Sequence, residues 1–147
     1  MIIFLDFDGT VVEHAYPEIG SYVDGCYKVI AKLQKAGHKI ILNSYRIQSK
    51  SGKLKLALNH INECGYGIIE PLTDFSKSKI NPFYWNWDIF MTFSFIFLDD
   101  ECLGVPLKKG NLNPDRMVVD WEEVDRQFEA NGIYTTYALK YFDSNAA

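Results

Sequence analysis

Three short stretches of the chain are rich in consecutive apolar residues instead of alternating apolar and polar ones. They are residues 1–5, 38–43 and 93–98. A run without alternation is typical of a strand that is buried on both faces, as strands are in a parallel sheet. We therefore expect three central strands, and a shorter strand at Tyr66–Glu70 that Pro71 closes.

Apolar residues at helical spacing separate these strands. From Ser21 they recur every three or four positions until Gly37, and a second such pattern runs from Leu54 to a stop near Gly65. Strand, helix and strand in this order form the unit of a parallel sheet. The pattern predicts an α/β fold, a three-layer sandwich around a central, mostly parallel sheet.

The last third of the chain predicts smaller elements. Gly104–Leu107 indicates a turn and Met117–Val119 an edge strand. Asp120 is placed to cap a helix, and Glu123 three residues later would complete a capping box. The inward face of this helix is formed by Trp121, Val124 and Phe128.

Composition indicates one domain, residues 1–147, whose 48% hydrophobic residues suffice for a packed core. Cys26, Cys64 and Cys102 lack the CxxC spacing of a zinc site, so we expect each to be a small buried residue. The most apolar segment, residues 90–98, is far shorter than the roughly 20 residues of a membrane helix. No basic segment precedes the first apolar run, so we expect a cytoplasmic protein without a membrane partner.

Polar side chains follow three of the expected strands, where a core would not select them. Asp6 and Asp8 come after the first strand, Ser44 and Arg46 after the second, and Asp99-Asp100 after the third. The carboxyl ends of parallel strands face one crevice, so these groups should meet there. Asp8-Gly9 alone could be an ordinary turn pair, but four carboxylates together need a compensating cation, and Mg²⁺ suits them.

At this point the sequence resembles the haloacid dehalogenase (HAD) superfamily. The run Asp6-Phe7-Asp8-Gly9-Thr10 after an apolar strand is similar to its first motif, Ser44 to its second and Asp99-Asp100 to its fourth. The resemblance implies a HAD-like, Rossmannoid phosphatase that hydrolyses phosphomonoesters through an aspartyl-phosphate. The spacing leaves no room for a folded cap domain, as in small capless members from bacteria and phages.

The resemblance also implies residue roles. Asp6 would be the nucleophile and Asp8 the general acid and base. Mg²⁺ would be held by Asp6, the backbone carbonyl of Asp8, Asp99 and Asp100. Ser44 would donate a hydrogen bond to the transferring phosphoryl group.

The third motif of the superfamily is a lysine ahead of the acidic strand end. Lys77 and Lys79 both fall in the right interval; we favour Lys79 as the catalytic lysine and assign Lys77 to substrate binding. Further candidates for substrate contacts are Thr10, Asn43 and Arg46. Arg46 is suited to this role because a guanidinium fork matches phosphate oxygens.

The substrate stays open at the level of sequence. An uncapped site could take a polynucleotide 3′-phosphate, or a small phosphomonoester if a homo-oligomer partner covers it. Basic residues between Arg46 and Lys55 favour a polyanion, whereas the net charge of −4 disfavours nucleic acid. A non-catalytic phosphate-binding module is a further alternative. A receiver domain is disfavoured, because its acidic pair ends the first strand and its phosphorylated aspartate a later one, whereas here the Asp-x-Asp-Gly-Thr run comes first and the adjacent pair later. Aromatic residues at 83–87 could line the substrate site or form a satellite core.

Overall fold

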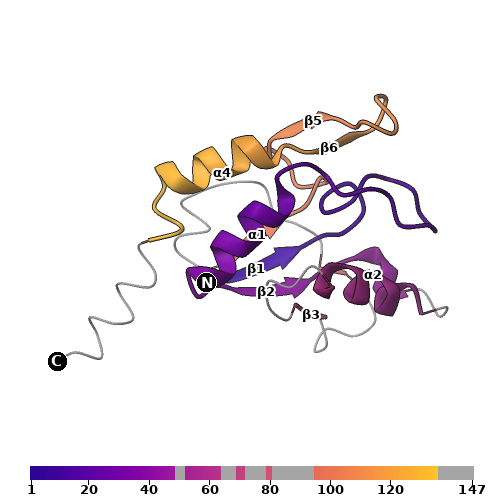
Figure 1. Cartoon of the computed structure of the whole chain (residues 1–147), viewed down its shortest axis with the longest axis horizontal. Helices are drawn as coiled ribbons and strands as arrows, with labels where there is room; N and C mark the ends of the chain where they lie inside the picture. The colour runs from indigo at the N-terminus through magenta and orange to yellow at the C-terminus, as the bar shows by residue number, and fades with distance from the viewer. Residues whose placement is uncertain (49–51, 64–68, 72–78, 81–94, 136–147) are drawn as a thin grey trace.

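The computed structural model describes residues 1–48, 52–63, 69–71, 79–80 and 95–135. Its central element is a four-stranded parallel sheet in the order β3-β2-β1-β4. Figure 1 shows β1 and β2 running in one direction. Their bounds are Ile2–Leu5 for β1, Lys39–Leu42 for β2, Glu70–Pro71 for β3 and Phe95–Leu98 for β4.

The sheet register places three strand ends side by side. Leu5 of the central strand β1 is level with Leu42 of β2 and with Leu98 of β4. The backbone ladder continues one step further, because Asp6 N donates to Leu98 O at 2.9 Å and Asn43 N donates to Leu5 O at 2.8 Å. The residues that follow the three strands therefore begin at the same edge of the sheet.

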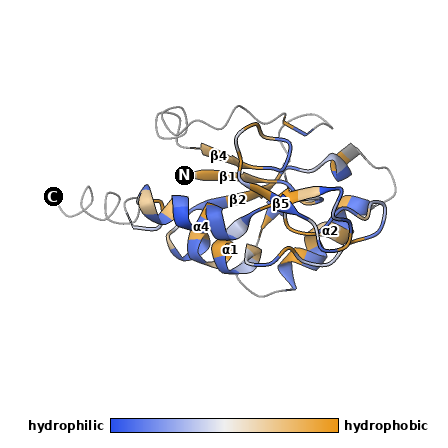
Figure 2. Ribbon diagram, turned by 90° about the horizontal axis from the view of Figure 1, so that it is seen from above, coloured by the Kyte–Doolittle hydropathy of each residue, from blue (hydrophilic) through white to orange (hydrophobic). Residues whose placement is uncertain are grey.

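The described helices are α1 (Cys26–Lys35), α2 (Lys53–Asn62), α4 (Trp121–Ala130) and the short 3-10 helix η1 (Tyr45–Gln48). Figure 2 shows α1 and α4 together along one side of the apolar strands. An ion pair joins them, since Lys32 Nζ of α1 lies 2.9 Å from Asp125 Oδ1 of α4. The α/β fold with a mostly parallel sheet is as the sequence predicts, and it is consistent with the three-layer sandwich.

Helix α1 begins at Cys26, so the prediction of a helix from Ser21 was wrong at its start. Tyr22 instead forms a β-bridge with Val12 in the loop after β1. Gly25 then adopts a φ of 84°, in the left-handed region that favours glycine, and this residue precedes the first helical turn. The apolar spacing thus continued through a loop that packs on the core.

The predicted edge strand Met117–Val119 is present as β6. It pairs antiparallel with β5 (Leu107–Lys109), so Leu107 belongs to a hairpin strand and not to the predicted turn. A turn was expected because this strand is short and polar, and its pairing partner lies eight or more residues further on. The hairpin packs beside the site because Val119 N donates to Gly9 O at 3.0 Å.

The predicted cap of α4 is half formed as a capping box. Asp120 Oδ1 accepts from Glu123 N at 3.2 Å, as expected. The reciprocal bond is replaced, because the Asp120 N–H donates to Pro106 O at 2.8 Å and the Glu123 carboxylate pairs with Arg126.

Several further expectations can be compared with the described residues. Cys26 and Cys102 are buried, as expected, and burial raises the pKa of the Cys102 thiol to about 12. Cys64, most of Tyr66–Glu70 and the aromatic residues 83–87 lie outside the described residues. Among the described helices, none is both long and apolar enough to cross a membrane. The segment between β1 and α1 is a loop, and most of the connection from β3 to β4 lies outside the described residues.

Candidate active site

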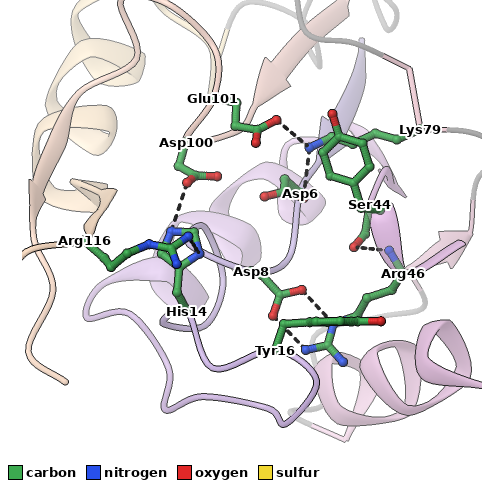
Figure 3. Close-up of a pocket in the computed structure, with 11 residues that line it drawn as sticks. Asp6, Asp8, His14, Tyr16, Ser44, Arg46, Lys79, Asp100, Glu101 and Arg116 are labelled. Atoms are coloured by element: carbon green, nitrogen blue, oxygen red, sulfur yellow. Dashed lines mark hydrogen bonds and ion pairs between the residues drawn. The ribbon is translucent and has the colours of Figure 1, made fainter. Parts of the chain in front are cut away.

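A pocket of about 430 Å³ opens at the carboxyl edge of the sheet. Figure 3 shows acidic and basic side chains pointing into it from several elements. Its lining residues are Asp6, Asp8, His14, Tyr16, Ser44, Tyr45, Arg46, Lys79, Asp100, Glu101 and Arg116. The pocket volume is that of a small-molecule site.

Asp6 is the buried carboxylate at the floor of this site, with 4% of its surface exposed. Its Oδ1 lies 3.3 Å from Lys79 Nζ, and its Oδ2 accepts from Thr10 Oγ1 at 3.2 Å. Burial, together with the negative charge of Asp99, raises the pKa of Asp6 well above its ordinary value, although Lys79 opposes this shift. Asp6 therefore depends on nearby positive charge to stay ionised.

Lys79 is the cation between two buried carboxylates. Its Nζ lies 2.7 Å from Asp99 Oδ2, closer than to Asp6. Burial by itself would lower the pKa of Lys79, but the charges of Asp6 and Asp99 outweigh it and raise the pKa above the ordinary value. Lys79 is thus held as an ammonium group at neutral pH.

Asn43 determines where Lys79 sits. Its Nδ2 donates to Ile80 O at 2.9 Å, and its Oδ1 accepts from Ile80 N at 2.8 Å. This two-bond clamp joins the end of β2 to the backbone next to Lys79. Asn43 is 1% exposed, so it acts on the site through this clamp and its side-chain amide does not reach the pocket.

Three carboxylates form a candidate metal centre. One oxygen each from Asp6, Asp99 and Asp100 lies within 4.8 Å of the others. Lys79 supplies a single positive charge against these three groups, and burial also raises the pKa of Asp100. Hard carboxylate oxygens are the donors that Mg²⁺ prefers, and Asp6 and Asp100 also line the polar pocket, so the residues fit this ion.

Asp100 is also oriented from the outer side of the pocket. His14 Nε2 lies 3.1 Å from Asp100 Oδ2, and Arg116 Nη2 lies 3.1 Å from His14 Nδ1. A guanidinium can only donate, so Nδ1 accepts and the ring hydrogen is on Nε2, where it points to Asp100. Asp100 thereby remains a hydrogen-bond acceptor next to the metal centre.

Asp8 faces the pocket from the same loop as Asp6 but has a different partner. Arg46 donates to it twice, from Nε to Oδ2 at 2.7 Å and from Nη2 to Oδ1 at 2.7 Å. This fork-to-fork contact is a geometrically specific ion pair. The Asp8 side chain is 19% exposed, so it can still reach a ligand in the pocket.

Arg46 itself is 1% exposed, although it is charged. Two of its three remaining N–H donors go to backbone carbonyls, at 3.3 Å from Nη1 to Pro17 O and 2.8 Å from Nη2 to Glu18 O. The rings of Phe7 and Tyr16 lie over the guanidinium carbon, with centroids 5.2 and 5.1 Å away. Arg46 therefore fastens the loop after β1 to the end of β2.

The turn that follows Asp8 requires glycine at position 9. Gly9 has a φ of 82°, and a Cβ there would collide with the imidazole of His14 and with Asp100 Oδ2. Thr10, which follows, accepts from Asp100 N through its hydroxyl at 3.2 Å. Its carbonyl accepts from Trp121 Nε1 at 2.7 Å, which ties the loop to α4.

The structure brings most of the expected site residues together. Those that line the pocket or its metal cluster are Asp6, Asp8, Ser44, Arg46, Lys79, Asp99 and Asp100. Ser44 accepts from Arg46 N at 3.2 Å, which leaves its hydroxyl hydrogen free to point elsewhere. Thr10 is fully buried and bonded to Asp6 and Asp100, so it positions these groups and does not line the pocket. Lys77 lies outside the described residues.

Sequence reasoning missed five pocket residues. They are His14, Tyr16, Tyr45, Glu101 and Arg116. His14 and Tyr16 lie in the loop after β1, Tyr45 begins η1, and Arg116 precedes β6. The only available signal was proximity in sequence to the polar strand ends, which applies to Tyr45 next to Ser44 and to Glu101 next to Asp100. Arg116 gave no such signal because hairpin docking brings it there.

Comparison with known proteins supports the fold and nothing finer. A solved structure described as a conserved protein coded by a locus of Bacteroides thetaiotaomicron superposes with a TM-score of 0.58. The two proteins are 22% identical, and the match covers 89% of this chain and 91% of that one. No protein-family model matches the sequence, and no curated protein matches it significantly. At this identity the likeness shows a shared α/β architecture.

Proposed function

We propose that the protein is a Mg²⁺-dependent phosphomonoester hydrolase of the HAD type that works through an aspartyl-phosphate on Asp6. The observation that carries this proposal is the pairing of two different carboxylates in one pocket. Asp6 is buried beside Lys79 and the carboxylate cluster, whereas Asp8, two residues later, faces the pocket in an ion pair with Arg46. A nucleophile and a proton-transfer group need these two different surroundings.

In this mechanism an oxygen of Asp6 attacks phosphorus and the leaving oxygen departs in line with it. Lys79 favours the ionised form of Asp6 and Thr10 fixes its rotation, so the attacking oxygen is oriented before substrate arrives. The Ser44 hydroxyl and the Lys79 ammonium group are donors for the phosphoryl oxygens, where charge is spread in the transition state.

Asp8 transfers the proton in both halves of the reaction. It donates to the leaving oxygen in the first step and takes a proton from the hydrolytic water in the second. Each Asp8 oxygen accepts one hydrogen bond from Arg46 and keeps a second lone pair, on which Asp8 can carry a proton toward the pocket.

Asp6, Asp99 and Asp100 are the side chains that would hold Mg²⁺, with the backbone carbonyl of Asp8 as the fourth protein ligand that the HAD resemblance implies. When bound, Mg²⁺ supplies positive charge that offsets the carboxylates and the incoming phosphate. Asp99 is fully buried and its Oδ1 accepts from Glu101 N at 2.9 Å, so the protein sets the orientation of this carboxylate.

The test is hydrolysis of an aryl phosphate by the purified protein with Mg²⁺. We expect turnover at a pH between about 5 and 8, the range of carboxylate acid and base chemistry. Asp6→Asn should abolish turnover, and Asp8→Asn should bind metal normally but turn over slowly. Asp115→Asn, an exposed aspartate of the hairpin, serves as the matched control.

Three results would contradict the proposal in different ways. Absence of turnover across this pH range would favour the alternative of a non-catalytic phosphate-binding module. Turnover that is unchanged in Asp6→Asn would remove the assignment of the nucleophile while leaving a hydrolase. A loss of metal affinity in Asp8→Asn would make Asp8 a side-chain ligand instead of the proton-transfer group.

A further inference from the structure

Two tyrosines line the pocket and are still largely exposed. Tyr16 is 58% exposed and Tyr45 is 49% exposed. Each covers a cation that pairs with Asp6 or Asp8, since the Tyr16 ring lies 5.1 Å from Arg46 Cζ and the Tyr45 ring 4.5 Å from Lys79 Nζ. The two rings therefore belong to different halves of the site, Tyr16 beside the partner of Asp8 and Tyr45 beside the partner of Asp6.

In phosphoryl transfer the attacking and leaving groups lie on opposite sides of phosphorus, so Tyr16 and Tyr45 would lie near different parts of the substrate. Asp6 attacks from one side of phosphorus, and Asp8 protonates the leaving oxygen on the other. The rest of the leaving group must extend from that oxygen, on the side where Arg46 holds Asp8. Of the two exposed tyrosines among the described pocket residues, Tyr16 is the one that lies on this guanidinium.

Tyr16 is also held in place before any substrate binds. Its ring rests on Arg46. Arg46 also donates to the backbone carbonyls of Pro17 and Glu18, the two residues that follow Tyr16. A preorganised aromatic surface binds a flat ring with little loss of side-chain entropy. The part of the Tyr16 ring that does not contact Arg46 stays exposed, so a ligand that covered it would add hydrophobic stabilisation.

We propose that the substrate is a nucleoside monophosphate whose base stacks on Tyr16 while its phosphate reaches Asp6. The inference rests on the proposed function, because the direction of the leaving group comes from the roles of Asp6 and Asp8. A pocket of about 430 Å³ is of a size to hold a single nucleotide. Stacking on an aromatic side chain suits any base, so Tyr16 would select for a base without selecting which one.

The experiment measures equilibrium binding in the Asp6→Asn background, where no phosphoryl transfer occurs. The probes are adenosine 5′-monophosphate and ribose 5-phosphate, which share the phosphate and the sugar and differ in the base. We expect the nucleotide to bind at least about tenfold more tightly, the usual contribution of one stacked base. Equal affinity for the two probes would overturn the proposal.

Variants of the two tyrosines then locate the preference. Tyr16→Leu should abolish the nucleotide preference while leaving the affinity for ribose 5-phosphate within about twofold, well inside the effect of one stacked base. Tyr16→Phe and Tyr16→Trp should keep the preference, and they test the idea even if the leucine variant folds poorly. Tyr45→Leu is the matched control, an equally exposed pocket tyrosine, and should also keep the preference.

The remaining outcomes are also decisive. A preference that survives Tyr16→Leu, or that disappears in Tyr45→Leu alone, would contradict the assignment to Tyr16. A 3′-phosphorylated trinucleotide that binds more than about tenfold tighter than the mononucleotide would replace the free nucleotide by a polynucleotide end. Because the assay needs no turnover, a failure of base stacking is distinguishable from a failure of the proposed hydrolase activity.

Discussion

Arg46 holds both carboxylate oxygens of Asp8, with Nε 2.7 Å from Oδ2 and Nη2 2.7 Å from Oδ1. This pair joins the ends of two neighbouring strands, because Asp8 follows β1 and Arg46 lies in η1 after β2. The arginine is buried, whereas the aspartate is open to the pocket. Arg46 therefore sets the position of the proposed acid and base, while its expected contact with the substrate phosphate stays a prediction for this pocket-lining residue.

Arg46→Lys should lower both turnover and stability. Lysine keeps the charge but loses the fork, so Asp8 would be held through one contact and the carbonyls of Pro17 and Glu18 would lose their donors. We expect kcat to fall by about 10- to 100-fold and the free energy of unfolding by about 1 to 3 kcal/mol. Steady-state kinetics and urea unfolding measure the two effects.

The control for this variant is Arg126→Lys, which changes an exposed ion pair with Glu123 on α4. That substitution should leave kcat unchanged and alter stability by less than about 1 kcal/mol. A normal kcat in Arg46→Lys would show that the bidentate geometry does not matter for Asp8.

Lys79→Met should destabilise the metal-free protein and abolish most activity. It leaves the buried carboxylates of Asp6 and Asp99 without their shared cation, which costs about 3 to 5 kcal/mol for a buried pair. Turnover should fall at least about 100-fold, because a donor to the phosphoryl group is lost. Urea unfolding with and without Mg²⁺ measures the first effect.

Mg²⁺ should stabilise Lys79→Met more than it stabilises the unchanged protein, since the acidic cluster then lacks its internal positive charge. Lys39→Met is the control, because its pair with Glu70 is exposed on both sides and should contribute less than about 1 kcal/mol. Equal Mg²⁺ stabilisation of Lys79→Met and the unchanged protein would mean that the ion does not bind near Lys79.

Asp6→Asn should stabilise the protein in EDTA at neutral pH while abolishing activity. The pKa of Asp6 in the folded protein lies well above its ordinary value of 3.8, mainly because of burial and then Asp99. As pH rises from the ordinary pKa through the raised one, the unfolded chain ionises more readily than the folded protein, so the free energy of unfolding falls. Asparagine does not ionise and therefore avoids this loss. We expect a gain of about 1 to 2 kcal/mol near pH 7.

The sign of this effect has a direct check. As pH falls below about 4, Asp6 is protonated in both the folded and the unfolded state, so the advantage of Asp6→Asn should fade. Thermal unfolding in EDTA between about pH 4 and 8 follows the difference. A variant that is less stable than the unchanged protein at neutral pH would show that the pair with Lys79 outweighs burial.

Asp125 makes the opposite contribution, far from the pocket. Burial alone would raise its pKa, but hydrogen bonds from Tyr134, Lys32 and Lys28 outweigh burial and lower the pKa to about 2. Because the folded pKa is depressed, the stabilisation is complete above the ordinary value of 3.8 and is lost as pH falls through about 2.

Asp125→Asn should therefore lower the free energy of unfolding by about 1 to 2 kcal/mol near pH 7, since its lysine partners are partly exposed. The difference from the unchanged protein should shrink as pH falls from about 4 toward 2. Urea unfolding at several pH values measures it, and activity at neutral pH should be unaffected. A difference that grows on acidification would contradict the depressed pKa.

The sequence by itself determined the strands and the residue types at their ends. The apolar runs at 1–5 and 93–98 are short enough to favour strands over helices, and the carboxylates that follow do not suit a core. Parallel strands end at a shared edge, so Asp6 and Asp99 were expected to meet if their strands are neighbours, as β1 and β4 are. Local chemistry also predicted the cap by Asp120, because capping involves residues only three positions apart.

The tertiary structure alone decided the partners of these residues. Asp6 and Lys79 are separated by 73 positions and Asp8 and Arg46 by 38, so no periodic pattern relates them. The same holds for the clamp of Asn43 on Ile80 and for the docking of Arg116 beside His14. Such contacts depend on strand register and loop packing, which arise only when the whole core has formed. Sequence therefore specifies which groups the site contains, and packing specifies which cation serves which carboxylate.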